Sequence, residues 1–238
     1  MNTITAEMTV GELVRERPGR SRIFEELGID YCCGGKKPLS DACAKKGHNI
    51  EAVLEAIVEA DLAGSVAVAE DYAEMPLDEL ADHIVATHHA FLVRELPRMQ
   101  QMAAKVSKVH GDKDERLGEL ASVVNALADE LASHMMKEER ILFPVIRQLE
   151  QSDSLPTMPF GTIANPIRAM EAEHDTAGNA LADMHRLTDA YTPPGWACNT
   201  YRALLDGLHE LELDLHQHIH KENNILFPRA LAVERSRR

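Results

Sequence analysis

Hydrophobic residues recur every three to four positions through most of the chain, which is the spacing of an amphipathic helix. After about residue 75 this pattern runs through four long segments, residues 76–107, 115–149, 162–190 and 196–232. Glycine, proline and serine interrupt it at Gly111, at residues 152–161 and at residues 193–195. Four helices of this length with such connections predict an antiparallel four-helix bundle.

Residues 1–64 predict a separate, smaller helical domain. Helices are expected over residues 10–17, 21–27, 40–46 and 50–62. Thr9 can cap the first of them, and the turn Asp-Tyr-Cys-Cys-Gly-Gly at residues 30–35 follows the second. Residues 65–75 show no sustained periodicity and predict a linker, so that residues 76–238 form the bundle. The sequence therefore predicts an all-α protein with two domains.

One short motif occurs twice within the bundle. His134-x-x-x-Glu138 is followed by Ile-Leu-Phe-Pro, and the same arrangement returns 84 residues later as His218-x-x-x-Glu222. The spacing places each histidine and glutamate on one helix face, within the apolar stripe. Burying an ionised glutamate costs several kcal/mol unless it is paired or binds a metal. Two such placements favour a metal site.

The other two long segments supply further candidate ligands. On the third segment His174 lies among apolar residues at helical spacing, whereas His185 lies among charged ones. The first segment offers His83, His88 and His89. Helical periodicity gives the last two of these equally many apolar neighbours, so position alone leaves the choice between them open.

Other histidines are predicted to lie outside the site. His216 and His220 are also four residues apart, but the residues 84 positions earlier are Ala132 and Met136, which cannot bind a metal as imidazoles do. We therefore expect both to be surface residues or to lie around the site. The remaining histidines are expected in loops or on the surface, namely His48, His110 and His209.

Four histidines and two glutamates, without thiolate, suit iron, manganese or zinc. If both glutamates bridge two metals, each metal receives two nitrogen and two oxygen ligands, and an oxo or hydroxo bridge leaves one octahedral position open. Ferritin-like centres are the alternative, but they need two Glu-x-x-His motifs, and only residues 171–174 fit. Glu130, Glu173 and Asp214 are candidates to orient the ligand imidazoles, with solvated helix charges as the alternative.

Composition narrows the partners and the compartment. A formal net charge of −14 repels phosphate backbones and anionic lipids, which argues against nucleic acid and membranes as partners. No apolar run approaches the ~18 residues of a membrane span, and the N-terminus lacks an apolar signal core. Cys32, Cys33, Cys43 and Cys198 are too few and too unevenly placed for a disulfide framework. We therefore expect a cytoplasmic protein with reduced thiols.

The order His, His-x-x-x-Glu, His, His-x-x-x-Glu over four helices resembles a hemerythrin-like di-iron domain. Residues 30–36, Asp-Tyr-Cys-Cys-Gly-Gly-Lys, are in addition similar to the RIC family, the di-iron proteins for repair of iron centres (ScdA/YtfE type). The Asp-His-Ile-Val run from Asp82 and the Glu-Leu-Pro ending at Pro97 fix the alignment and select His89 over His88. The resemblance implies six iron ligands, with both glutamates bridging: His89, His134, Glu138, His174, His218 and Glu222.

What the resemblance implies for function is repair of iron-sulfur clusters damaged by nitrosative or oxidative stress, by donation of iron from a labile site of two iron ions. Damaged iron-sulfur proteins would be the partners. The family is also linked to nitric oxide, so the alternatives are a di-iron nitric oxide reductase and a protein that senses or binds nitric oxide or dioxygen. Whether the chain forms a homodimer stays open.

The cysteine turn is expected to provide the reactive thiols of this chemistry. Cys32 and Cys33 would capture iron or nitric oxide, since Gly34 and Gly35 should expose the turn and the two following lysines should favour thiolate. Cys43 and Cys198 are expected to be structural thiols.

Overall fold

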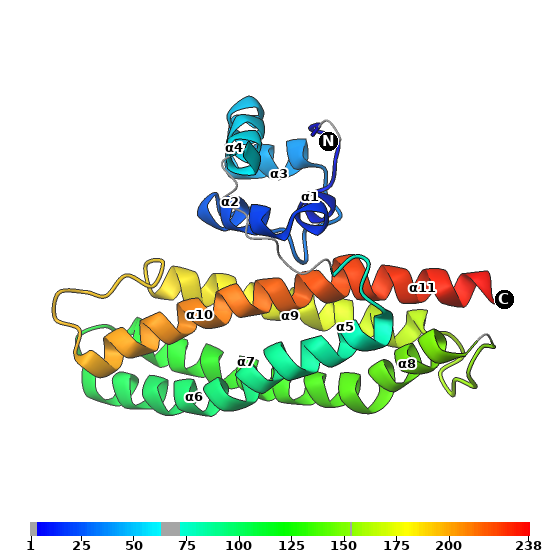
Figure 1. Cartoon of the computed structure of the whole chain (residues 1–238). Helices are drawn as coiled ribbons and strands as arrows, with labels where there is room; N and C mark the ends of the chain where they lie inside the picture. The colour runs from blue at the N-terminus through cyan, green and yellow to red at the C-terminus, as the bar shows by residue number, and fades with distance from the viewer. Residues whose placement is uncertain (1–3, 63–71, 153) are drawn as a thin grey trace.

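The computed structural model describes residues 4–62, 72–152 and 154–238. Within these ranges the chain forms helices and no β-strand, apart from an isolated antiparallel bridge between Thr9 and Pro38. A long helical bundle carries a smaller helical module on one side, near the middle of its length (Figure 1). The predicted all-α class is confirmed. None of the helices in the described part of the chain is long and apolar enough to cross a membrane.

All four long helices of the bundle form close to the predicted positions, and three of them contain a π-helical turn. The first consists of α5 (Leu77–Ile84), η2 (Val85–His89) and α6 (Ala90–His110). The second consists of α7 (Arg116–Lys137), η3 (Glu138–Leu142) and α8 (Phe143–Gln151). The third is α9 (Ala164–Leu187), and the fourth consists of α10 (Asn199–Lys221), η4 (Glu222–Leu226) and α11 (Phe227–Ser236).

The π-turns η3 and η4 follow from the end of the duplicated motif. In η3 the amide of Phe143 donates to the carbonyl of Glu138, five residues back, and in η4 Phe227 donates to Glu222 in the same way. The proline after each phenylalanine has no amide hydrogen for the carbonyl four residues back, which opens the α-helical ladder at this point. Each repeat therefore places a π-turn directly at its glutamate.

The bundle core has two apolar parts with a polar layer between them. One part packs α6, α7 and α10 together and includes Met99, Leu127 and Leu208. The other packs α5, α8 and α11 together and includes Ile84 and Ile146. Each fully buried side chain of this kind contributes about 1.5–3 kcal/mol to folding. The two apolar parts hold the four helices in register around the polar layer.

The N-terminal module has its own apolar core. It consists of α1 (Val10–Glu16), η1 (Pro18–Arg20), α2 (Ser21–Glu26), α3 (Leu39–Lys46) and α4 (Ile50–Leu62). Thr9 caps α1 as predicted, in a capping box with Glu12. Core residues come from all four α-helices, for example Leu13, Phe24 and Ile57. The module therefore buries a core that is separate from that of the bundle.

The predicted linker 65–75 lies mostly outside the described residues. Of its last four residues, Tyr72 and Met75 accept hydrogen bonds from the Arg229 guanidinium through their carbonyl oxygens, which ties this end to α11. The domain boundaries themselves stay predictions.

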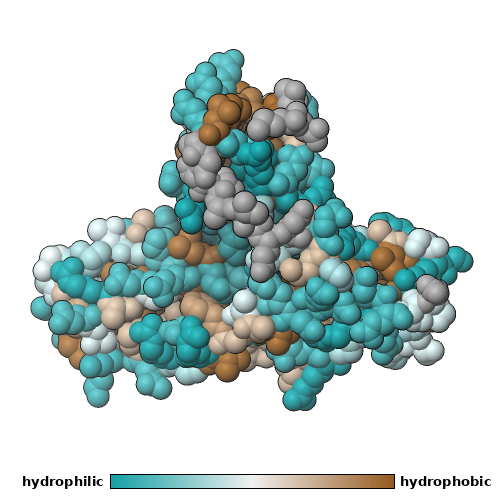
Figure 2. All heavy atoms as spheres, in the orientation of Figure 1, coloured by the Kyte–Doolittle hydropathy of each residue, from teal (hydrophilic) through white to brown (hydrophobic). Residues whose placement is uncertain are grey.

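The bundle surface in Figure 2 is mostly hydrophilic, in keeping with the charge of the chain.

Candidate metal centre

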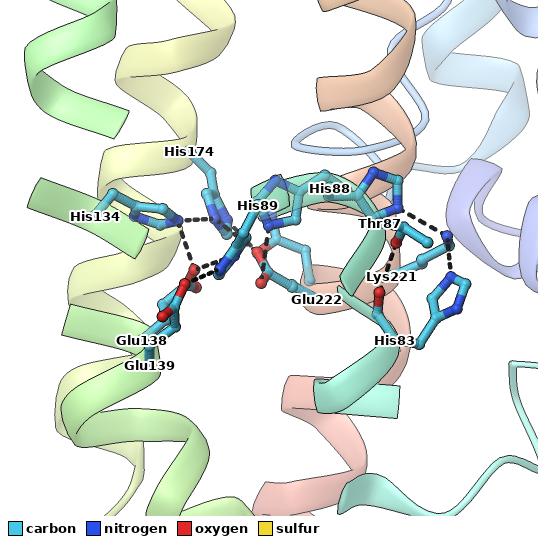
Figure 3. A network of polar contacts seen from close by, with 12 residues as sticks. His83, Thr87, His88, His89, His134, Glu138, Glu139, His174, Lys221 and Glu222 are labelled. Atoms are coloured by element: carbon cyan, nitrogen blue, oxygen red, sulfur yellow. Dashed lines mark hydrogen bonds and ion pairs between the residues drawn. The ribbon is translucent and has the colours of Figure 1, made fainter. Parts of the chain in front are cut away.

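The polar layer of the bundle brings together the six residues proposed as ligands. Figure 3 labels all of them except His218. Each of them is at most 3% exposed. The two glutamates and one histidine lie in the π-turns, and the other three histidines lie on α-helices. The six are His89 on η2, His134 on α7, Glu138 on η3, His174 on α9, His218 on α10 and Glu222 on η4.

Their donor atoms form two groups that share both glutamates. His89 and His218 face Glu138 and Glu222 in one group, and His134 and His174 face the same carboxylates in the other, with the donor atoms of each group within 4.8 Å of one another. Glu138 Oε2 lies 3.3 Å from His89 Nε2 and 3.2 Å from His134 Nε2. Glu222 lies 3.1 Å from His174 Nε2 and 3.2 Å from His218 Nε2. Each carboxylate therefore stands between the two groups, where a bridging ligand is expected.

Several of these buried atoms have no hydrogen-bond partner among the described residues. They are both carboxylate oxygens of Glu138, Oε2 of Glu222 and Nε2 of His89. A buried polar atom without a hydrogen bond costs about 1–3 kcal/mol and is rare in native proteins. Metal ions between the two carboxylates would satisfy all four atoms. The donor set and its burial therefore fit a di-iron type of centre.

Charge within the cluster balances between the imidazoles and the carboxylates. Burial by itself lowers the pKa of His134, but the carboxylates of Glu138 and Glu222 outweigh it and raise this pKa to about 9. Burial raises the pKa of Glu222, but His218 and His174 outweigh it and hold the pKa well below its usual range. Metal ions that bind here therefore displace protons from imidazole nitrogens.

Three of the four histidines are oriented by a hydrogen bond at the second ring nitrogen, Nδ1. The partners are Glu139 for His89 at 2.8 Å, Glu173 for His134 at 2.9 Å and Asn223 for His174 at 2.9 Å. Such contacts fix the ring and direct Nε2 towards the centre. Nδ1 of His218 is buried without a partner among the described residues.

Sequence reasoning identified only one of these partners. Glu173 adjoins His174 in the sequence but orients His134, on a different helix. Glu139 and Asn223 were missed, although each directly follows a glutamate of the duplicated motif and they are 84 residues apart. Glu130 was expected to be a candidate, but it is exposed and makes no hydrogen bond to His134 in the described structure.

His88 lies beside the centre but faces away from it. Its Nδ1 lies 2.8 Å from Asp214, and its Nε2 lies 2.8 Å from the ammonium of Lys221. Burial lowers the pKa of His88 to about 4, so the neutral ring donates to the carboxylate and accepts from the ammonium. The His88 ring stacks on that of His218, with centroids 5.3 Å apart. The structure therefore brings His89, and not His88, to the other five residues, and Asp214 orients His88 rather than a candidate ligand.

Comparison with known proteins agrees with this geometry. The model of the hemerythrin HHE cation binding domain matches residues 80–230, and that of a domain of unknown function, ScdA_N, matches residues 6–61. The iron-sulfur cluster repair protein YtfE of Pectobacterium atrosepticum is 43% identical over 96% of this chain and 98% of its own. Those of Escherichia coli O157:H7 and Citrobacter koseri are 41% identical over the same shares. The chain belongs to the RIC (YtfE) family. The resemblance inferred from the sequence is confirmed.

The cysteine turn of this RIC-family chain lies against the candidate centre. Cys33 Sγ is 3.4 Å from the backbone carbonyl of His174, and the sulfur atoms of Cys32 and Cys33 are 3.9 Å apart. Asp30 also contributes, because its Oδ1 accepts from the Cys32 thiol at 3.2 Å. The three side chains place their donor atoms within 4.8 Å of one another. The turn therefore offers its own small group of metal-binding atoms.

The expectation of an exposed thiolate at this turn is wrong for Cys32. Its side chain is buried, and its neighbour Cys33 and burial together raise the pKa of the Cys32 thiol. Lys36, expected to favour thiolate, instead forms an ion pair with Glu171 at 2.6 Å. Glycine spacing and nearby lysines did not reveal that the turn is packed against another helix.

Two histidines expected near the surface are buried. His220 is 3% exposed and lies under Tyr31 of the N-terminal module, with ring centroids 5.6 Å apart. His110 is 8% exposed and lies 3.2 Å from Cys198 Sγ. Neither belongs to the two groups of candidate ligands. The surface prediction is wrong for His110. For His220, which was expected at the surface or around the site, only the surface alternative is wrong, because packing against Tyr31 covers it.

A cavity of about 230 Å³ lies between α7, α9 and α10 and reaches the candidate centre. Its walls include the imidazoles of His134, His174 and His218. Apolar side chains such as Leu131 and Leu215 form other parts of the wall, and the exposed Glu130 also lines it. In this RIC-family protein a small molecule or an ion therefore has a route to three of the four histidines.

Proposed function

We propose that this protein repairs iron-sulfur clusters damaged by nitrosative or oxidative stress, by donating iron from a labile site. Two observations support the proposal together. Relatives named for iron-sulfur cluster repair align with almost the whole chain, and six buried donors stand in two groups that share two carboxylates. The arrangement of the donors is the decisive observation, because each group offers two histidines and two shared glutamates to one of two ions.

The proposed iron ligands are those expected from the sequence: His89, His134, Glu138, His174, His218 and Glu222. Imidazole and carboxylate ligands hold iron without the soft thiolates that iron-sulfur proteins use. Iron therefore gains a preferred ligand type when it passes to a cluster that has lost it. Damaged iron-sulfur proteins are the partners in this proposal, and the iron is the cargo.

We propose two routes by which iron leaves the centre, through the cavity and by transfer to the cysteine turn. The cavity reaches His134, His174 and His218 from between three helices. Cys33 lies against the backbone of His174 and stays a proposed acceptor of iron or nitric oxide, together with Cys32. Free cysteines also support work in a reducing compartment, and we infer the cytoplasm.

The test is anaerobic transfer of iron to an enzyme whose cluster has been damaged by nitric oxide. Protein loaded with iron should restore the activity of that enzyme and lose iron in proportion. The matched variants are Glu222→Gln, which removes a bridging carboxylate, and Glu210→Gln, which changes an exposed charge on α10. Equal restoration by wild type and Glu222→Gln, or none by the iron-loaded wild type, would contradict the proposal.

A second function is favoured by the cavity. Apolar residues such as Leu131 and Leu215 form part of its wall, and three of the candidate ligand histidines line it, which suits a small uncharged gas such as nitric oxide. Anaerobic addition of nitric oxide to the ferrous protein separates the alternatives. Catalytic formation of nitrous oxide supports a nitric oxide reductase, reversible binding supports a sensor, and the absence of both eliminates this second function.

A further inference from the structure

Asn224 joins the bundle to the cysteine turn. Its side-chain Nδ2 donates to the carbonyl oxygens of Tyr31 and Cys32, at 3.3 Å and 3.1 Å. The Tyr31 carbonyl lies immediately before Cys32 and the Cys32 carbonyl immediately before Cys33, so the hydrogen bonds fix the backbone that carries both thiols. No other asparagine side chain in the described part of the chain bonds to this turn.

Two glycines from separate segments make room for Asn224. A Cβ atom at Gly11 of α1 or at Gly35 of the cysteine turn would lie 2.5 Å from Asn224 Oδ1, closer than real Cβ atoms approach. The amide of Gly11 also donates to the carbonyl of Gly35 at 2.8 Å, which holds the two glycines side by side. The slot therefore depends on glycine at both positions.

The same contact region is extended by the residues around Tyr31. The Tyr31 hydroxyl donates to Glu25 at 2.7 Å and accepts from Gln217 at 2.8 Å, and its ring lies edge-on to His220. Lys36, after the turn, pairs with Glu171 on α9. The turn is therefore held on both α9 and α10, and Asn224 holds the backbone that carries the thiols.

The order of residues in η4 links Asn224 to the candidate metal centre. Glu222 is a candidate bridging ligand, Asn223 accepts from His174 Nδ1, and Asn224 holds the thiol turn. These are three consecutive residues of one π-turn. The thiol of Cys33 in turn donates to the carbonyl of His174.

We propose that Asn224 is a positioning residue that holds the Cys32 and Cys33 thiols at the metal centre, and that Gly11 and Gly35 are required to admit it. The inference rests on the proposed function, because it assigns the thiols to the exchange of iron with the same molecule's centre. Because the thiols belong to the same chain as the centre, this exchange of iron needs no second copy of the protein.

The first test measures whether Asn224 holds the turn. Iron-loaded protein is treated anaerobically with iodoacetamide, and alkylation of each cysteine is followed by mass spectrometry. In Asn224→Ala, Cys32 should react about tenfold faster or more, because two hydrogen bonds to its turn are lost. Exposed Cys198 is the internal reference, and Asn125→Ala, an exposed asparagine on α7, is the matched control. Equal rates at Cys32 in wild type and Asn224→Ala would overturn the inference.

The second test uses the glycine slot. Gly11→Ala should raise the Cys32 alkylation rate by a similar factor. In an Asn224→Ala background its further effect should be smaller, because the contact at 2.5 Å with Asn224 Oδ1 is gone and only the backbone contact at 2.9 Å with the Gly35 carbonyl oxygen remains. Additive effects would show that Gly11 acts independently of Asn224 and would overturn the slot.

The third measurement addresses the thiols themselves. Asn224→Ala should keep the full iron content yet deliver iron to the damaged enzyme as slowly as Cys32→Ser/Cys33→Ser. Wild-type delivery by an Asn224→Ala protein with a released turn would overturn the positioning role. If wild type delivers no iron at all, the proposed function fails, whereas the alkylation result still decides whether Asn224 holds the turn.

Discussion

Substitution of the adjacent histidines His88 and His89 distinguishes the candidate ligand from its neighbour. Both are buried, and both lie in the π-turn η2. His89→Ala removes one nitrogen from the group that contains His218 and both glutamates, and it leaves the other group of four donors complete. The metal content should therefore fall from two ions per chain to about one. His88→Ala leaves all six candidate ligands in place, so two ions should remain.

Stability should respond in a different way from metal content. His88 forms one hydrogen bond with Asp214 and one with Lys221. Its removal therefore costs the carboxylate of Asp214 and the buried ammonium of Lys221 one hydrogen bond each. A hydrogen bond to a charged group contributes about 1.5–3 kcal/mol, and Lys221 retains His83 as a partner. The free energy of unfolding of His88→Ala should therefore fall by roughly 2–4 kcal/mol.

Two assays read these effects separately. Elemental analysis after anaerobic reconstitution gives the number of ions per chain, and urea unfolding of the metal-free proteins gives the stability. His209→Ala, an exposed histidine of α10, is the control for the loss of an imidazole. Two ions in His89→Ala together with fewer in His88→Ala would refute the assignment of the first helix.

Three further predictions concern the surroundings of the centre and the backbone. Glu173→Gln should lower metal affinity about 10–100-fold, because Glu173 orients His134, whereas Glu130→Gln should leave it unchanged in a chelator competition. Because the pKa of His134 is raised to about 9, a metal ion displaces a proton from this imidazole at neutral pH. The affinity for cobalt should therefore increase as the pH is raised towards 9, by up to about tenfold for each pH unit, and an affinity that does not change with pH would contradict this. Ala190→Gly should raise the free energy of unfolding in urea by about 1 kcal/mol, because Ala190 has φ 56°; a loss of stability, as expected for Ala126→Gly within α7, would contradict it.

The part of the site that the sequence could predict is the part that lies within single helices. His134 and Glu138 are four residues apart, so helix geometry alone places both on one face, and the apolar residues around them show that this face is buried. The proline of each repeat also lies within the helix that it interrupts. Thr9 and Glu12 form a capping box for the same local reason.

The contacts that the sequence could not predict join segments far apart in the chain. Asn224 meets residues 11, 31, 32 and 35, and no periodicity relates these positions. The choice between His88 and His89 depends on Lys221 and Asp214, which lie on another helix. Cys32 was expected to be exposed because two glycines follow it, but a glycine that creates a slot for a distant side chain has the same appearance in the sequence as one that exposes a turn.

The duplicated motif also conceals a difference between its two halves. Each copy has a lysine before its glutamate, but Lys137 pairs with Glu173, which accepts from His134 Nδ1, whereas Lys221 is buried against His88. A carboxylate at Nδ1 increases the basicity of an imidazole ligand, so His134 gains a support that His218, without a partner at Nδ1 among the described residues, does not have. The repeat therefore supplies equal candidate ligands in unequal surroundings, and the two copies of one motif differ in the support that their histidines receive.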